Sequence, residues 1–279
     1  MSLKAAFTIK LGHKILPKTV SVGKFDGIHP SLVAATASSK LFVHTPHRPS
    51  AETGGRLLAS DIADVSLLNI NQPIKAVAVG KMRVASDEHD VVVVGTPTHV
   101  LAYDMDNNSD LFYREVPDGV NCLVIGQLGG VDQPIAICGG NCAIQGFDAT
   151  GHDPFWTVTG DNVTALCLCD YDGDGKLELI VGSEDFDIRV FKGDEIIAEI
   201  TETEAITGLC WLGEGNKFAY ALANGTLGLY EGNNRIWRIK SKNHVVSIAM
   251  YDIDGDGEKE MAIGWTNGKV RENFALQNV

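Results

Sequence analysis

A short apolar strand that ends in a small residue recurs at nearly constant spacing along this chain of 279 residues. The closing residues of five successive copies are Gly95, Gly139, Gly182, Ala223 and Gly264. Each copy continues through a polar turn into a second apolar strand, as in residues 179–182 followed by 188–191. A repeat of about 41–44 residues made only of short strands is typical of a four-stranded propeller blade, whereas helical repeats show a period of about 3.6 residues. The pattern predicts an all-β fold, a β-propeller of four-stranded blades.

A weaker first copy in residues 32–36 and 40–43 brings the number of recognisable repeats to six. Each later repeat opens with an apolar stretch that we expect to be an innermost strand, buried on both faces by the neighbouring blades. These stretches are residues 75–79, 121–125, 163–169, 206–211 and 245–250. The interval from Thr36 to Gly95 is longer than those between the later copies, which predicts an inserted loop within residues 45–71.

Residues 1–279 are expected to form a single β-propeller domain, because propellers of this size fold as one unit. The sixth repeat is cut short after Asn273, and two closures are compatible with that. Either residues 7–11 supply an outer strand that seals a six-bladed ring, or the six repeats are part of a seven-bladed ring.

The charge and residue composition of the chain exclude some classes of binding partner and location. The chain has 23 Lys and Arg against 36 Asp and Glu, a net charge of -13, so its field repels nucleic acid and anionic lipid. We find no signal peptide and no apolar run of about 18 residues, and therefore expect no membrane insertion and a cytoplasmic location. The cysteines lie mostly in apolar runs and are expected to be buried free thiols of a reducing compartment. They are Cys122, Cys138, Cys142, Cys167, Cys169 and Cys210.

Two acidic loops share one pattern, and their first residues, Asp170 and Asp252, are separated by two repeats. The first acidic loop is residues 170–178, with candidate ligands Asp170, Asp172, Asp174, Lys176 and Glu178. The second acidic loop is residues 252–260, with candidate ligands Asp252, Asp254, Asp256, Glu258 and Glu260. Carboxylates at positions 1, 3, 5 and 9 offer the oxygen ligands that Ca²⁺ prefers, and Lys176 and Glu258 would contribute backbone carbonyls. Rigid turns without a metal are the alternative reading of these Asp-Gly loops.

The loops are not EF-hands, because position 12 holds Val181 or Ile263 instead of glutamate and strands flank them. They resemble the FG-GAP loops of integrin α-subunit propellers. A partial copy around Asp26 and Gly27 lacks the other carboxylates and is not expected to bind a metal.

Motifs for catalysis are not found: there is no phosphate-binding glycine loop, no nucleophile elbow and no metal-ligand spacing among the histidines. The acidic residues 183–187 are expected to form a solvated hairpin turn, with a partner surface as the alternative. Five aromatic residues are expected to pack between blades, with sugar stacking as the alternative. They are Phe155, Trp156, Trp211, Trp237 and Trp265.

Several long stretches resemble the Bardet-Biedl syndrome 2 family of BBSome subunits. They are residues 107–116, 139–147, 155–162, 182–192 and 237–244. The resemblance implies the N-terminal propeller of a longer, non-enzymatic scaffold subunit of a coat-like complex that carries membrane proteins to and from cilia. It also implies pairing with the Bardet-Biedl syndrome 7 protein through regions beyond this chain, and a location at the cilium, ciliary membrane and basal body. The alternative function is an extracellular calcium-dependent adhesion or sugar-binding propeller.

Overall fold

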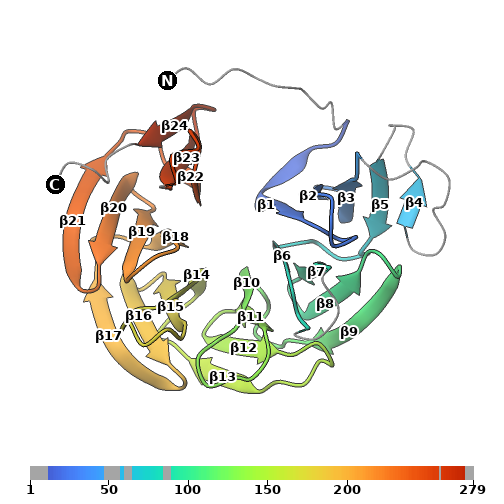
Figure 1. The fold of residues 1–279 in the computed structure, drawn as a ribbon, viewed down its shortest axis with the longest axis horizontal. Coiled ribbons are helices and arrows are strands. Elements are labelled where there is room, and N and C mark those ends of the chain that lie inside the picture. The colour runs from blue at the N-terminus through green and yellow to red at the C-terminus, as the bar shows by residue number, and fades with distance from the viewer. Residues whose placement is uncertain (1–11, 47–56, 60–64, 84–88, 258, 274–279) are drawn as a thin grey trace.

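The computed structural model describes residues 12–46, 57–59, 65–83, 89–257 and 259–273. These residues form six antiparallel sheets, which stand side by side around a common centre as blades (Figure 1). The all-β fold and the six blades predicted from the repeat are confirmed. The described part of the chain contains no helix long and apolar enough to cross a membrane.

Each blade is a meander whose strands follow one another in the sheet, except that β5 lies between β3 and β4. Blade 1 consists of β1 (Ile15–Gly23), β2 (Ser31–Thr36), β3 (Lys40–His44), β5 (Val65–Asn69) and β4 (Leu57–Ala59). Blade 2 consists of β6 (Ala76–Gly80), β7 (Val91–Gly95), β8 (His99–Asp104) and β9 (Ser109–Glu115). Blade 3 consists of β10 (Cys122–Gly126), β11 (Ile135–Gly139), β12 (Ala143–Phe147) and β13 (Phe155–Val158).

Blades 4 and 5 follow the same four-stranded plan, and the described part of blade 6 has three strands. Blade 4 consists of β14 (Val163–Cys169), β15 (Glu178–Ser183), β16 (Asp187–Lys192) and β17 (Glu195–Thr201). Blade 5 consists of β18 (Ile206–Trp211), β19 (Lys217–Leu222), β20 (Thr226–Glu231) and β21 (Asn234–Lys240). Blade 6 consists of β22 (Val245–Tyr251), β23 (Glu260–Trp265) and β24 (Val270–Asn273).

The predicted innermost strands are confirmed, since β6, β10, β14, β18 and β22 face the centre together with β1 (Figure 1). Their predicted burial on both faces holds for most of β14 but is wrong for β10 and β22. All five residues of β10 are only half-buried, and β22 alternates between half-buried and exposed positions after Val245. Five of the innermost strands, β1, β10, β14, β18 and β22, line a central cavity of about 780 Å³, which leaves part of their surface uncovered. The fully buried strands are instead the second ones, such as β7, β11 and β15.

The hydrophobic core is a series of five apolar clusters, each formed between two successive blades. The cluster between blades 4 and 5, for example, joins Ile180 of β15 to Ile206 of β18 and Phe218 of β19. Burying one apolar residue of this size stabilises a fold by about 1.5–3 kcal/mol. Packing between blades therefore holds the propeller together, whereas hydrogen bonds hold each blade.

Blade 1 differs from the sequence prediction. The segment 45–71, expected to be an inserted loop, contains β5 as the fourth strand and β4 as an added fifth strand. Figure 1 shows blade 6 and blade 1 at the two ends of an open ring. Residues 7–11 lie outside the described residues, so the prediction that they seal the ring stays a prediction.

Candidate metal-binding loops and blade junctions

The two acidic loops occupy equivalent places in the fold. Each joins the first strand of a blade to the second: β14 to β15 in blade 4, and β22 to β23 in blade 6. Because every blade is the same meander, both loops lie on the same face of the propeller, two blades apart. The equivalence expected from their separation by two repeats is confirmed.

Matching hydrogen bonds shape both loops. The carboxylate of Asp170 accepts hydrogen bonds from the backbone N–H of Gly173 at 2.9 Å and of Gly175 at 3.2 Å. The carboxylate of Asp252 accepts the corresponding bonds from Gly255 at 2.7 Å and Gly257 at 3.0 Å. All four glycines have positive φ, so a side chain at any of them would strain the turn. The Asp-Gly sequence of each loop thus forms a rigid turn in which the carboxylates point toward the inside of the loop.

The last carboxylate of each loop lies at the start of the second strand and is buried. Glu178 is 1% exposed, and its Oε2 accepts a hydrogen bond from the N–H of Tyr171 at 2.8 Å. Glu260 is 6% exposed and accepts the equivalent bond from Ile253 at 2.6 Å. The first residue of the second strand thus lies under each loop and holds one carboxylate at the buried side of the loop, which we call the floor of the loop.

The predicted ligands come together, but not equally in the two loops. One oxygen from each of Asp252, Asp254, Asp256 and Glu260 lies within 4.8 Å of the others. In the first acidic loop only Asp170, Asp172 and Glu178 form such a group, which leaves Asp174 outside it. Glu258 lies outside the described residues. Lys176 donates its backbone N–H to Asp174 at 2.8 Å, and the carbonyl role expected for it stays a prediction.

A lysine explains the difference between the two loops. Lys192, at the end of β16, donates hydrogen bonds from Nζ to Oδ2 of Asp172 and, at 2.7 Å, to Oδ2 of Asp174. The same Nζ lies 3.7 Å from Oε1 of Glu178. The hydrogen bonds to the two aspartates raise the pKa of Lys192, and the bond from Lys192 in turn lowers the pKa of Asp174. The first acidic loop therefore surrounds a cationic group that the chain itself supplies.

Lys192 is a site residue that the sequence analysis missed. Leu179 lies opposite Phe191 in the pairing of β15 with β16, so Lys192 follows directly on the strand that runs beside Glu178. In blade 6, Met261 lies opposite Asn273, and the corresponding next residue is Phe274. Phe274 lies outside the described residues, but a phenylalanine carries no ammonium group. Aligning the two strands of this hairpin in the sequence would have predicted that Lys192 lies beside Glu178.

The first acidic loop also contacts both neighbouring blades. The Tyr171 hydroxyl donates a hydrogen bond to Oδ1 of Asn233 in blade 5 at 2.8 Å. On the other side, the N–H of Gly129 in blade 3 donates to the carbonyl of Leu177 at 2.8 Å. The loop is therefore a junction of three blades.

The partial copy near the N-terminus has a different arrangement. The carboxylate of Asp26 accepts hydrogen bonds from the N–H of Ile28 at 2.9 Å and of His29 at 2.6 Å, and contacts the His29 ring at 2.7 Å. These hydrogen bonds, that from the His29 N–H foremost, lower the pKa of Asp26. The prediction that this turn binds no metal stays a prediction.

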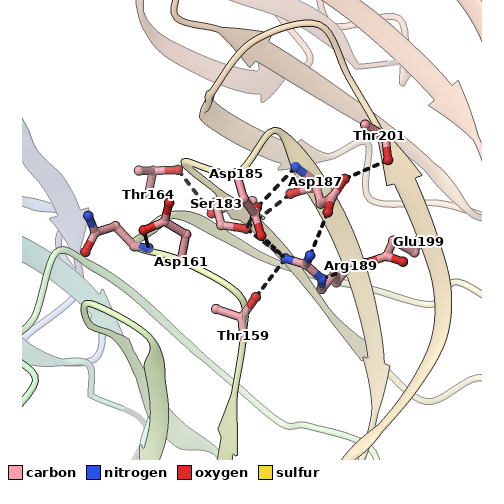
Figure 2. A network of polar contacts seen from close by, with 11 residues as sticks. Thr159, Asp161, Thr164, Ser183, Asp185, Asp187, Arg189, Glu199 and Thr201 are labelled. Atoms are coloured by element: carbon pink, nitrogen blue, oxygen red, sulfur yellow. Dashed lines mark hydrogen bonds and ion pairs between the residues drawn. The ribbon is translucent and has the colours of Figure 1, made fainter.

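The acidic turn at residues 183–187 is not the solvated turn that we expected. Arg189 on β16 donates to Asp185 at 2.8 Å, to Asp187 at 2.6 Å and to Glu199 at 2.7 Å. Figure 2 shows the guanidinium at the centre of this network, which also reaches Thr159 of blade 3 at 3.0 Å. The Arg189 side chain is 11% exposed. The turn is thus a partly buried link between blades 3 and 4.

A second polar cluster, which the sequence analysis did not find, links blades 4 and 5. The Glu202 side chain is fully buried after the end of β17 and accepts hydrogen bonds from the Tyr230 hydroxyl at 2.5 Å and from Arg235 at 3.3 Å. Burial and the Glu202 carboxylate raise the pKa of nearby Tyr220 to about 12. A buried carboxylate needs such partners, because an unpaired charge in the interior is costly.

Two other expectations need correction. Trp156 on the outer strand β13 is 57% exposed and does not pack between blades, whereas Phe155 and Trp265 are buried there as expected. All six cysteines are free, as expected, but Cys142 is exposed rather than buried. Trp156 lies on an outer strand and Cys142 in the turn between β11 and β12, and both places face solvent.

Comparison with known proteins identifies the family. The family model described as ciliary BBSome complex subunit 2, N-terminal, matches residues 21–126, and the model described as its middle region matches residues 165–272. Together the two models match most of the chain, and the N-terminal model matches residues that precede those of the middle-region model. The chain belongs to the ciliary BBSome complex subunit 2 family. The resemblance stated from the sequence is thereby confirmed.

Relatives of this family match nearly the whole chain. BBSome complex member BBS2 of Rattus norvegicus is 57% identical over 96% of this chain, and the Homo sapiens protein is 56% identical over the same share. BBSome complex member bbs-2 of Caenorhabditis elegans is 47% identical over 75% of the chain. The chain spans 37% of the length of the rat and human relatives.

Solved structures confirm the propeller. A crystal structure of BBS1N in complex with ARL6DN matches 94% of this chain and 80% of its own with a TM-score of 0.74 at 15% identity. The WD40 β-propeller domain of Doa1 matches 94% of this chain and 79% of its own with a TM-score of 0.66 at 11% identity. At such low identity the likeness shows the fold alone.

Proposed function

We propose that the protein is a non-enzymatic scaffold subunit of the BBSome, which takes part in carrying membrane proteins to and from cilia. The observation that carries this proposal is the match to BBSome complex member BBS2, 57% identical over 96% of the chain. Family membership supports a role in binding other proteins rather than in catalysis.

The other BBSome subunits are the proposed partners. Pairing with the Bardet-Biedl syndrome 7 protein would use regions of the full-length protein beyond this chain, and ciliary membrane proteins would be the cargo. The proposed location is the cytoplasm together with the cilium, the ciliary membrane and the basal body. Exposed apolar residues on the outer strands, such as Trp156 on β13 and Ile196 on β17, are of the kind that protein interfaces bury.

The polar clusters of the described residues support a scaffold role. The guanidinium of Arg189 and the carboxylate of Glu202 pair with other residues of the chain at blade junctions. Such groups fix the relative positions of blades, and a rigid propeller keeps its binding surfaces in one arrangement. The alternative of an extracellular adhesion or sugar-binding propeller has less support, because family membership favours the BBSome role.

Affinity purification of the tagged full-length protein from ciliated cells tests this proposal. We expect mass spectrometry to identify the other BBSome subunits in amounts comparable to the tagged protein. Cells that express the tag alone provide the control. Recovery of the tagged protein without any BBSome subunit would overturn the proposal.

A further inference from the structure

We propose that the first acidic loop is a divalent-cation site of the calcium class, and that the ammonium group of Lys192 competes with the ion for it. The proposal concerns this chain alone and does not depend on the BBSome role. It rests on the ligand set, on a buried carboxylate oxygen without a hydrogen-bond partner, and on the position of the lysine.

The ligand set suits a hard cation. Oxygens of Asp170, Asp172 and Glu178 lie within 4.8 Å of one another, and Asp174 lies on the same loop. The nine residues of the loop hold four carboxylates and one cation, Lys176, so the loop keeps an excess of negative charge that Lys192 only partly balances. Calcium takes six to eight oxygen ligands, and backbone carbonyls or water would complete the shell.

The second observation is a buried oxygen at the base of the loop, which favours a cation there. Oε1 of Glu178 is inaccessible to solvent and has no hydrogen-bond partner, whereas Oε2 is held by the N–H of Tyr171. A buried carboxylate oxygen without a partner is costly. The oxygen belongs to the carboxylate at the floor of the loop, and its nearest cationic group is Nζ of Lys192 at 3.7 Å.

Lys192 pairs with the exposed carboxylates of the loop but donates no hydrogen bond to the buried oxygen. Its ammonium contacts the exposed carboxylates of Asp172 and Asp174 but stays beyond hydrogen-bond distance of Glu178. A calcium ion bonds to oxygen at about 2.3–2.6 Å and could contact the floor carboxylate directly. The lysine and the ion cannot occupy one carboxylate cluster together, because both are cations. The side chain of Lys192 is 39% exposed and has a flexible four-carbon stem, so it can move into solvent when the ion binds.

The second acidic loop is another candidate cation site in the same chain. It has the same aspartates and glutamate, and the sequence position that corresponds to Lys192 is Phe274, which carries no ammonium group. To keep its contribution out of the measurement, the experiment uses a chain in which the second loop carries Asp252→Asn and Asp254→Asn.

The experiment is calorimetric titration of this background with Ca²⁺ alone, with Lys192 unchanged, as Lys192→Met and as Lys192→Arg. We expect Lys192→Met to bind Ca²⁺ at least about tenfold more tightly than the parent, because it removes a unit charge a few ångströms from the ion. Lys192→Arg keeps the charge and is expected to stay within about threefold of the parent. Adding Glu178→Gln to Lys192→Met is expected to weaken binding at least about tenfold.

Thermal unfolding in a chelator checks that each variant is folded. If Lys192→Met does not fold, Lys192→Gln replaces it, because glutamine also removes the charge and keeps a polar end. Equal affinities of the parent and the uncharged variants would overturn the competition. No binding to any variant at millimolar Ca²⁺ would overturn the site itself.

Discussion

Ile206 occupies the space that a side chain on Gly182 would need. A Cβ on Gly182 would lie 2.4 Å from Cγ2 of Ile206, which is far inside van der Waals contact. The same relationship recurs between Gly139 and Val163, at 2.5 Å, one blade earlier. The glycine that closes the second strand of a blade therefore lets the first strand of the next blade approach.

Replacing Gly182 is expected to loosen the packing of blade 4 against blade 5. Gly182→Ala should lower the free energy of unfolding by about 1–3 kcal/mol, as overpacking a close-packed site does. Urea unfolding followed by circular dichroism measures the change. Gly208→Ala is the matched control, because the nearest atom to its Cβ lies 3.6 Å away, and a change within about 0.5 kcal/mol is expected. Equal effects of the two substitutions would contradict the explanation.

Tyr230→Phe tests the buried cluster between blades 4 and 5. The substitution removes the hydroxyl that donates to Glu202 and leaves a buried carboxylate with fewer partners, so a loss of about 1–3 kcal/mol is expected. The measurement is thermal or urea unfolding at neutral pH. Tyr113→Phe, at a position 49% exposed, is the control and should change stability by less than about 0.5 kcal/mol. A neutral Tyr230→Phe would show that the contact contributes nothing.

Arg189→Met is expected to destabilise the junction of blades 3 and 4 by about 2–4 kcal/mol, since it leaves Asp185 and Asp187 without their cation. Arg189→Lys keeps the charge but cannot reach several acceptors at once, and an intermediate loss is expected. Unfolding measured by near-ultraviolet circular dichroism would report both variants. A lysine variant as unstable as the methionine variant would indicate that geometry matters and charge does not.

Stability should fall in acid partly through Asp185. Although burial alone would raise the pKa of Asp185, hydrogen bonds from Ser183 and Arg189 lower it below the usual value of 3.8. A depressed pKa contributes stability that is present above the unfolded pKa and is lost as pH falls through the folded value. The stability difference between the wild type and Asp185→Asn should therefore shrink between pH 7 and pH 3. Urea unfolding at both values measures it, and a constant difference would exclude this role.

Much of the fold could be predicted because the same packing requirement recurs in every blade. Each blade must present a small residue to its neighbour, and the nearly regular spacing from Gly95 to Gly264 records that requirement. The strand β1 was missed, since Pro17 and Lys18 interrupt its apolar pattern and its pairing with β2 is irregular after Ile15. The outer strands β4 and β5 were missed because prolines and glycines near them resemble a loop.

The site was predicted in part for a similar reason. Aspartates at alternate positions within one turn can be read directly from the sequence, and the structure brings most of them together. The contact of Arg189 with Thr159 joins residues 30 positions apart on different blades and depends on side-chain direction. Local pattern carries no information about such contacts. Lys192 is an intermediate case. It was not predicted, but the register of the two strands of its hairpin would have placed it beside Glu178.

Sedimentation of the tagged full-length protein from ciliated cell extract tests the central claim most directly. We expect the protein to migrate in one large particle together with the other BBSome subunits, and to leave that particle when blade packing is disrupted by Gly182→Leu. Migration of the wild-type protein as a free monomer, apart from every BBSome subunit, would contradict the claim.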